Sequence, residues 1–248
     1  VGLVAVLWWH GQGLRSATAI GWLLLLALGN AATGSRTGLL QWLLLPALLL
    51  VWQRSGRQTA GGRTPWSWPL LLWALLAYGL ASLALPHALT AWQGQAVPNA
   101  MSRLGEVSGC GSRQVLWANV LHLIGQKPWT GWGWNELKYA HYMANYPGTR
   151  FCDILGNAHN LPLHLAFAFG VPLALAVCLG TLAIVQRARP WRLTQLHDSL
   201  AWSVLAMIVL HSLLEYPLWY SPFQLALLWS IVLLWPTGHT AMARLRSG

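Results

Sequence analysis

The sequence contains very few charged residues. Only 8% of its 248 residues are Asp, Glu, Lys or Arg, whereas 56% are hydrophobic. A chain of this composition has too little polar surface to cover a water-facing globule. The composition therefore excludes an ordinary soluble domain and predicts an all-α, polytopic integral membrane protein.

Carboxylates are the scarcest charged groups, and they form no DxD motif and no paired acid and histidine cluster. The chain has five of them: Glu106, Glu136, Asp153, Asp198 and Glu215. An oxygen-ligated Mg or Mn site, as used by many metal-dependent sugar transferases, is hard to build from so few acids. We therefore predict no metal site and no cofactor, and positive charge at a site would come from arginine.

Cysteine is also rare, and the three cysteines follow no metal-ligand spacing. Cys110 and Cys152 fall in one polar stretch and Cys178 in an apolar one. A disulfide between the first two requires that their stretch faces an oxidising compartment, so the sequence leaves their pairing open.

The chain has no initiator Met and no basic segment before a cleavage site. It begins at Val1 inside an apolar run. This start predicts a fragment of a longer protein, without a signal peptide.

Apolar runs of roughly 17 to 25 residues, long enough to cross a bilayer as helices, follow one another along the chain. The predicted spans lie at 16–33, 38–53, 66–86, 160–185, 199–216 and 219–236, and residues 1–9 end another span.

Basic residues are concentrated in alternate connectors between these spans. If the spans alternate in direction, nine of the fifteen Lys and Arg residues fall on one side: Arg15, Arg54, Arg57, Arg63, Arg187, Arg189, Arg192, Arg244 and Arg246. By the positive-inside rule that side is cytoplasmic, so residues 33–38, 87–158 and 215–220 are extracytoplasmic. Topology thus accounts for most of the net charge of +10, and no nucleic-acid partner is needed.

This topology predicts three regions. Residues 1–86 hold transmembrane helices, residues 87–158 form an extracytoplasmic loop, and residues 159–248 hold C-terminal transmembrane helices. The loop is too long to be a passive connection. Its apolar residues have near-helical spacing behind Ser112, which predicts an amphipathic helix on the membrane.

Two arginines lie in unfavourable places. Arg36 sits in a tight hairpin on the translocated side, where it either snorkels to lipid headgroups or offers a fork of donors to a phosphate. Arg113 falls in the first turn of the amphipathic helix, where a cation opposes the helix dipole. Arg113 therefore either packs on the surface or has an anion beside it.

His159 precedes a predicted helix that begins with Asn160 as N-cap and Pro162 in the first turn. The positive end of a helix favours neutral imidazole, which is the form that a general base needs. The alternative is that His159 only satisfies the helix end.

Four motifs occur in order and on one predicted face: "TGSRTG" (33–38), "SRQVLW" with "KPWTGWGWNE" (112–136), "NAHN" (157–160) and "HSLLEYPLWY" (211–220). Together they resemble the O-antigen ligase and polymerase superfamily. The last motif is most similar to its branch of bacterial protein O-oligosaccharyltransferases. The resemblance covers roughly residues 17–236, which would be the C-terminal half of such an enzyme.

The resemblance implies metal-independent, inverting transfer of a glycan from undecaprenyl diphosphate. The active site would face the periplasm from the bacterial inner membrane. By the family pattern His159 is the essential histidine, Arg36 and Arg113 bind the donor diphosphate, and Tyr216 supports activity, with Glu215 and Asn160 as further supporting candidates.

The resemblance leaves the acceptor open. The "EYPLWY" turn favours a Ser or Thr hydroxyl of a periplasmic protein such as pilin. Lipid A-core, as in lipopolysaccharide biosynthesis, and glycan polymerisation remain the enzymatic alternatives. A transporter for a lipid-linked anion, or a structural subunit, is the non-enzymatic one, although a transporter is expected to carry charges inside its spans.

Overall fold

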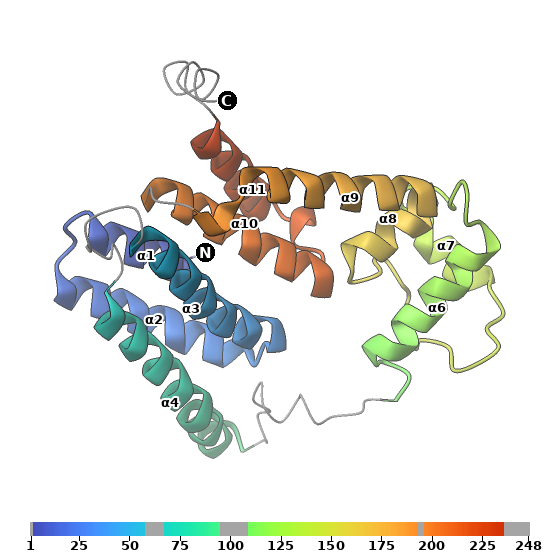
Figure 1. Ribbon diagram of the computed structural model, residues 1–248. Helices are drawn as coiled ribbons and strands as arrows, with labels where there is room; N and C mark the ends of the chain where they lie inside the picture. The colour runs from blue at the N-terminus through green and yellow to red at the C-terminus, as the bar shows by residue number, and fades with distance from the viewer. Residues whose placement is uncertain (1, 58–66, 95–108, 193–195, 236–248) are drawn as a thin grey trace, which may run out of the picture. The chain divides into compact units, whose positions relative to one another are not determined.

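The computed structural model describes residues 2–57, 67–94, 109–192 and 196–235, and all regular elements in these ranges are helices (Figure 1). Three of them are long and apolar enough to cross a membrane: α2 (Ser16–Thr33), α4 (Trp68–Gln93) and α9 (Val171–Ala188). The others are α1 (Gly2–Gly11), α3 (Arg36–Arg57), α6 (Arg113–Gln126), α7 (Leu137–Met143), α8 (Leu161–Phe169), α10 (Leu196–Leu214), α11 (Ser221–Leu234) and the short 3-10 helices η1 (Pro190–Arg192) and η2 (Pro217–Trp219). The predicted all-α membrane fold is confirmed.

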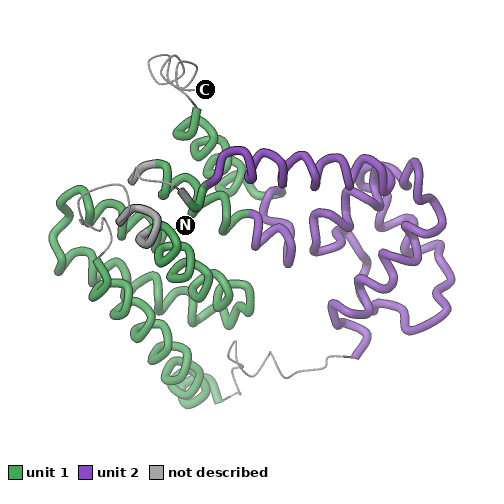
Figure 2. The backbone as a smooth tube through the Cα atoms, in the orientation of Figure 1, with its two compact units in different colours: residues 1–99, 190–208, 219–248 green, residues 100–189, 209–218 purple. Residues whose placement is uncertain are grey.

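The chain forms two compact units (Figure 2). The first unit comprises residues 1–99, 190–208 and 219–248, and the second comprises residues 100–189 and 209–218. The three regions predicted from the sequence, 1–86, 87–158 and 159–248, describe membrane topology, and they stay a prediction. Residues 58–66, Arg244 and Arg246, on which part of that topology depends, lie outside the described residues, and so does Glu106.

Small residues at four-residue spacing let two helices of the first unit pack closely. On α2 the buried positions are Ala19, Leu23, Ala27 and Ala31, and this helix packs against α4. Residues spaced by four lie on one face of a helix, and small side chains there allow the backbones to approach. Lipid tails solvate apolar helices as well as another helix does, so helix association in a membrane depends on close packing. The alanine-rich face of α2 permits such packing.

The turn from α2 to α3 is shaped by two glycines. Gly34 ends α2 in the left-handed conformation, with φ of 56°. A Cβ on Gly38 would lie 2.3 Å from Oδ1 of Asn30, so only glycine fits there. Arg36 is the first residue of α3 between them and is partly exposed. The tight hairpin predicted around Arg36 is therefore present.

The second unit is built around α6. Leu116, Val120 and Leu123 of this helix are at most 2% exposed and join a core with residues of α7 and α8. The predicted helix exists, and Ser112 caps it by accepting a hydrogen bond from the amide of Val115 at 3.3 Å. The prediction that its apolar face lies on the membrane is wrong for these three residues, because protein covers them.

The single span predicted at 160–185 is wrong, because Gly170 separates α8 from α9. Gly170 has φ of 87°, and a Cβ there would lie 2.2 Å from the carbonyl oxygen of Trp129. The amide of Val171 donates to the carbonyl of Pro128 at 2.8 Å. The segment that follows α6 thus packs so tightly against the chain that the helix cannot continue through this point.

Candidate active site

Glu215 joins two of the predicted site residues in the second unit. One carboxylate oxygen, Oε2, lies 2.6 Å from Nδ1 of His159. The other, Oε1, accepts a hydrogen bond from Nη2 of Arg113. The side chains of Arg113, Glu215 and His159 are 27%, 31% and 32% exposed, respectively. The imidazole of His159 and the guanidinium of Arg113 therefore contact the same carboxylate, and all three side chains are partly accessible.

Arg113 forms an ion pair with the carboxylate of Glu215. It is the first residue of α6, where the helix dipole disfavours a cation. The carboxylate of Glu215, 102 residues away in the sequence, offsets this by direct ion pairing. The predicted alternative of simple surface packing is therefore wrong for this side chain.

Asn160 brings His159 to Glu215. Its side-chain oxygen accepts from the amide of Leu163 at 3.0 Å, so it is the N-cap of α8 as predicted. Its amide nitrogen also donates to the carbonyl of Leu213 at 2.9 Å. This second bond ties the start of α8 to the end of α10, two residues before Glu215. Asn160 therefore both caps α8 and holds the start of this helix against the end of α10.

His159 itself has an unusual backbone and an aromatic neighbour. Its φ of 49° lies in the left-handed region, which is uncommon for residues other than glycine and often marks functional sites. Its ring meets Tyr216 edge-on, with the ring centroids 4.8 Å apart and the planes at 86°. Tyr216, predicted as a supporting residue, thus fixes one side of the imidazole.

The electrostatics define the proton positions. Burial raises the pKa of Glu215, but the hydrogen bond from His159 and the charges of His159 and Arg113 outweigh it, so the pKa lies below its usual range. An ionised carboxylate can only accept hydrogen bonds, so Nδ1 of His159 carries a proton. In the neutral form of the ring, Nε2 is then the nitrogen that can take a proton, and the charged form that results is the one that Glu215 stabilises.

Arg36 belongs to the first unit, whereas Arg113, His159, Glu215, Tyr216 and Asn160 belong to the second. The structure therefore assembles five of the six predicted residues. Whether Arg36 shares a ligand with Arg113 stays a prediction.

Cys110 and Cys152, whose pairing the sequence left open, form a disulfide with their Cα atoms 5.3 Å apart. The bond joins the segment before α6 to the segment between α7 and α8. It closes a loop with a sequence separation of 42 residues around the core of the second unit.

Removing this disulfide should destabilise the second unit. For a loop of this length the chain-entropy effect is roughly 3 to 4 kcal/mol. We expect the double variant Cys110→Ser with Cys152→Ser to unfold at a lower temperature, measured by a thermal melt in detergent. Cys178 is a free thiol, so Cys178→Ser is the matched control and should melt like the parent protein. Equal melting temperatures for all three proteins would contradict this.

Among the residues that the structure describes, no three or more His, Cys, Asp or Glu side chains lie together in a way that could hold a metal ion. The cationic group at the site is the guanidinium of Arg113.

Comparison with known proteins supplies a family. Residues 21–178 match the family described as O-antigen ligase, and residues 199–248 match the one described as virulence factor membrane-bound polymerase, C-terminal. The first match includes Arg36, Arg113 and His159, and the second includes Glu215 and Tyr216.

One relative is the general O-oligosaccharyltransferase of Acinetobacter baylyi (strain ATCC 33305 / BD413 / ADP1). It is 28% identical over 163 residues, which are 63% of this chain and 28% of the relative. The matched residues thus span less than a third of that protein's length. No solved structure matches the chain. The O-antigen ligase match covers well over half of the residues, and the chain therefore belongs to the O-antigen ligase family.

Proposed function

We propose that this chain carries the active site of an enzyme that moves a glycan from undecaprenyl diphosphate to a Ser or Thr hydroxyl of a periplasmic protein such as pilin. The observation that carries the proposal is the contact of Glu215 with both His159 and Arg113. The general O-oligosaccharyltransferase relative supports transfer of an oligosaccharide, and the "EYPLWY" turn favours a protein as its acceptor.

His159 is the general base in this proposal. Nε2 takes the proton of the acceptor hydroxyl as its oxygen attacks the anomeric carbon. Glu215, on Nδ1, keeps the ring in the required tautomer and stabilises the imidazolium that forms. Attack on the face opposite the leaving group gives inversion at the anomeric carbon.

Arg113 is the group that receives the leaving diphosphate. The bond from the anomeric carbon to the diphosphate oxygen breaks, and its electron pair stays on undecaprenyl diphosphate. A guanidinium has five N–H donors, so Arg113 can bind phosphate oxygens while Nη2 remains on Glu215. Arg36 is proposed as the second guanidinium on the same diphosphate. Two arginines then do what a metal ion does in other transferases.

The disulfide supports a periplasmic position for the second unit. Cys110 and Cys152 flank α6, and disulfides persist in the periplasm but are rare in the cytosol. This agrees with the arginine distribution, from which we predict residues 87–158 outside and residues 53–65 and 186–198 in the cytoplasm.

Labelling of introduced cysteines in whole cells checks this topology. Cysteines placed at 145 and 148, in the segment after α7, should react with a membrane-impermeant maleimide. A cysteine placed at 57 should react only after the cells are opened. Labelling of position 57 from outside would overturn the assignment.

Transfer should proceed without divalent cations. The proposed site uses guanidinium groups for the charge that Mg or Mn would supply, so chelation should leave the rate unchanged. The measurement is transfer by purified enzyme after EDTA treatment, with and without added Mg or Mn. Loss of transfer that Mg or Mn restores would show that a metal takes part.

An assay in vitro tests the proposed function itself. The full-length enzyme is mixed with lipid-linked glycan and, in separate reactions, with a pilin acceptor and with lipid A-core. We expect glycosylated pilin. Product on lipid A-core alone would identify an O-antigen ligase instead, and product with neither acceptor would contradict the proposal.

A further inference from the structure

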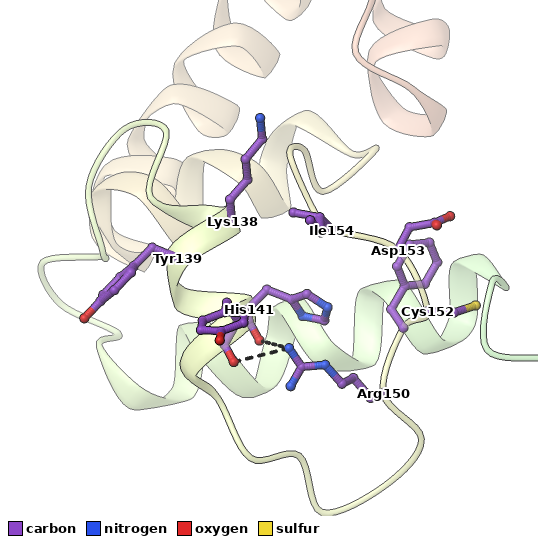
Figure 3. Close-up of a pocket in the computed structure, with 9 residues that line it drawn as sticks. Lys138, Tyr139, His141, Arg150, Cys152, Asp153 and Ile154 are labelled. Carbon is purple, nitrogen blue, oxygen red and sulfur yellow. Dashed lines mark hydrogen bonds between the residues drawn. The ribbon is translucent and has the colours of Figure 1, made fainter.

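The second unit contains a pocket that the proposed chemistry does not use. It lies between α7 and the segment that follows Arg150, and it has a volume of about 420 Å³ (Figure 3). This is within the range of roughly 300 to 1,000 Å³ typical of small-ligand sites. Its lining includes Lys138, Tyr142, Asp153 and Ile154, and none of its lining residues contacts Glu215 or His159 in the interactions described above.

The walls of the pocket are held in place by hydrogen bonds. The guanidinium of Arg150 donates to the carbonyl oxygens of His141 at 2.6 Å and Tyr142 at 3.3 Å (Figure 3). It also donates to the carbonyl oxygen of Ala144 at 3.0 Å, so it satisfies carbonyl groups at the C-terminal end of α7. His141 is 3% exposed, and its Nδ1 lies 2.7 Å from the hydroxyl of Tyr146. The disulfide of Cys152 fixes the opposite wall. The pocket is therefore preformed, which lowers the entropic cost of binding.

His141 supports the walls rather than the chemistry of the pocket. Burial lowers its pKa, and the charge of Arg150 lowers it further. A neutral, buried imidazole that is bonded to Tyr146 has no role as a cationic binding group.

The exposed surface of the pocket combines apolar faces with charges of both signs. Tyr139 is 58% exposed, Tyr142 is 75% exposed and Ile154 is 76% exposed. Lys138 comes from α7 and Asp153 from the segment after Cys152 (Figure 3). Within the described residues, no ion pair joins these two side chains. The pocket thus offers an aromatic surface, one donor-only group and one acceptor-only group.

This combination fits a sugar better than a charged peptide. Sugar hydroxyls both donate and accept, so they can use the ammonium group of Lys138 and the carboxylate of Asp153 together. The apolar C–H face of a sugar ring can lie on an exposed tyrosine ring, as amphipathic ligands do in pockets of this kind. A peptide side chain of either charge would meet one attractive and one repulsive charge here, since Lys138 and Asp153 are opposite in sign. The neutral hydroxyls of a sugar can bind to both groups without repulsion.

The pocket is also close enough to His159 to hold a distal part of the same glycan. Ile154 and His159 are five residues apart, which limits their separation to less than about 18 Å. Leu155 and Ala158, which lie between them, are 2% and 0% exposed and belong to the core of the second unit. The stretch between Ile154 and His159 is therefore anchored in the core of the second unit by Leu155 and Ala158.

We propose that this pocket is a glycan subsite that binds a sugar residue of the lipid-linked donor, away from the residue that is transferred at its anomeric carbon. This inference rests on the proposed function, since it takes the donor glycan as the ligand. It adds a site that sets which glycans, and of what length, the enzyme accepts.

Binding of free glycan tests the subsite separately from transfer. The probe is the oligosaccharide released from the host's lipid carrier by mild acid, which lacks lipid and diphosphate. Saturation-transfer NMR with the full-length protein in detergent should detect binding. Tyr142→Ala and Asp153→Asn should each weaken it about tenfold, whereas Tyr142→Phe should retain it. Met143 is 59% exposed on the same helix but does not line the pocket, so Met143→Ala is the control.

Donor length gives the second readout. A donor that carries a single sugar cannot reach the pocket, so its KM should be unchanged by Tyr142→Ala, whereas KM for the full-length donor should rise about tenfold.

Glycan binding should persist in His159→Ala even where transfer is absent, so failure of the proposed chemistry would not remove the binding signal. Unchanged glycan binding in a Tyr139→Ala, Tyr142→Ala double variant that retains its melting temperature would overturn the subsite. Loss of acceptor peptide binding instead of glycan binding would overturn it in favour of an acceptor surface.

Discussion

His159→Ala should abolish glycan transfer while leaving donor binding largely intact. Nε2 of His159 meets the acceptor hydroxyl rather than the phosphates, so its loss removes the base and not the donor contacts. We expect turnover to fall by roughly 10² to 10⁴-fold, the usual range for loss of general base catalysis. The measurement is single-turnover transfer beside donor affinity, both with the full-length protein.

The controls separate the base from the diphosphate binders. His122 is a second histidine in the same unit, on α6, and it is bonded to Gln126, so His122→Ala should transfer at the parent rate. Arg113→Ala and Arg36→Ala should weaken donor binding as well as turnover. Lysine at either position should rescue only partly, because a point charge does not reproduce the bidentate fork. Normal transfer by His159→Ala would contradict the assignment of His159 as the base and would leave it only a structural part at the start of α8.

Helix positions can be predicted from the sequence because they depend on local features, namely apolar runs and the residues that bound them. The predicted span at 16–33 coincides with α2, since its apolar run is bounded by Ser16 and by Gly34, which ends it. The break at Gly170 was missed, although Gly170 and Pro172 in "FGVP" are breaker residues. What decides the break is the approach of the Trp129 carbonyl, 41 residues earlier in the chain, and no window of sequence reports that contact.

The candidate site can be predicted only in part, because some of its contacts join residues that are far apart in the sequence. Arg113 in the first turn of a helix predicted an anion, and the chain has only five carboxylates, so Glu215 could have been chosen as its partner. The pairing with His159 could not, because it depends on the Asn160 to Leu213 hydrogen bond and on the left-handed backbone at His159. These are tertiary features, so from the sequence alone Glu215 is only a supporting candidate.

The central position of Glu215 has a consequence for acid stability. Its pKa in the folded protein lies below the ordinary value of 4.5. The ionised carboxylate therefore adds stability that is fully present above pH 4.5 and is lost as the pH falls through the lower folded value. Glu215→Gln should consequently melt below the parent protein at pH 7, and the difference should shrink as the pH falls below 4.5 and through the lower pKa of the folded protein.

The same substitution should have its largest effect on turnover. A glutamine at 215 can still accept a hydrogen bond from Nδ1 of His159, but it is neutral, so it cannot stabilise the imidazolium, and its NH₂ group opposes the donors of Arg113. We expect turnover to fall about 10²-fold and donor affinity to change less than tenfold, with Glu215→Asp partly active. Glu136 is an exposed carboxylate in the same unit without a side-chain cap bond, so Glu136→Gln is the matched control and should leave both quantities unchanged. If Glu215→Gln turns over like Glu136→Gln, the carboxylate only shapes the unit, and His159 acts without it.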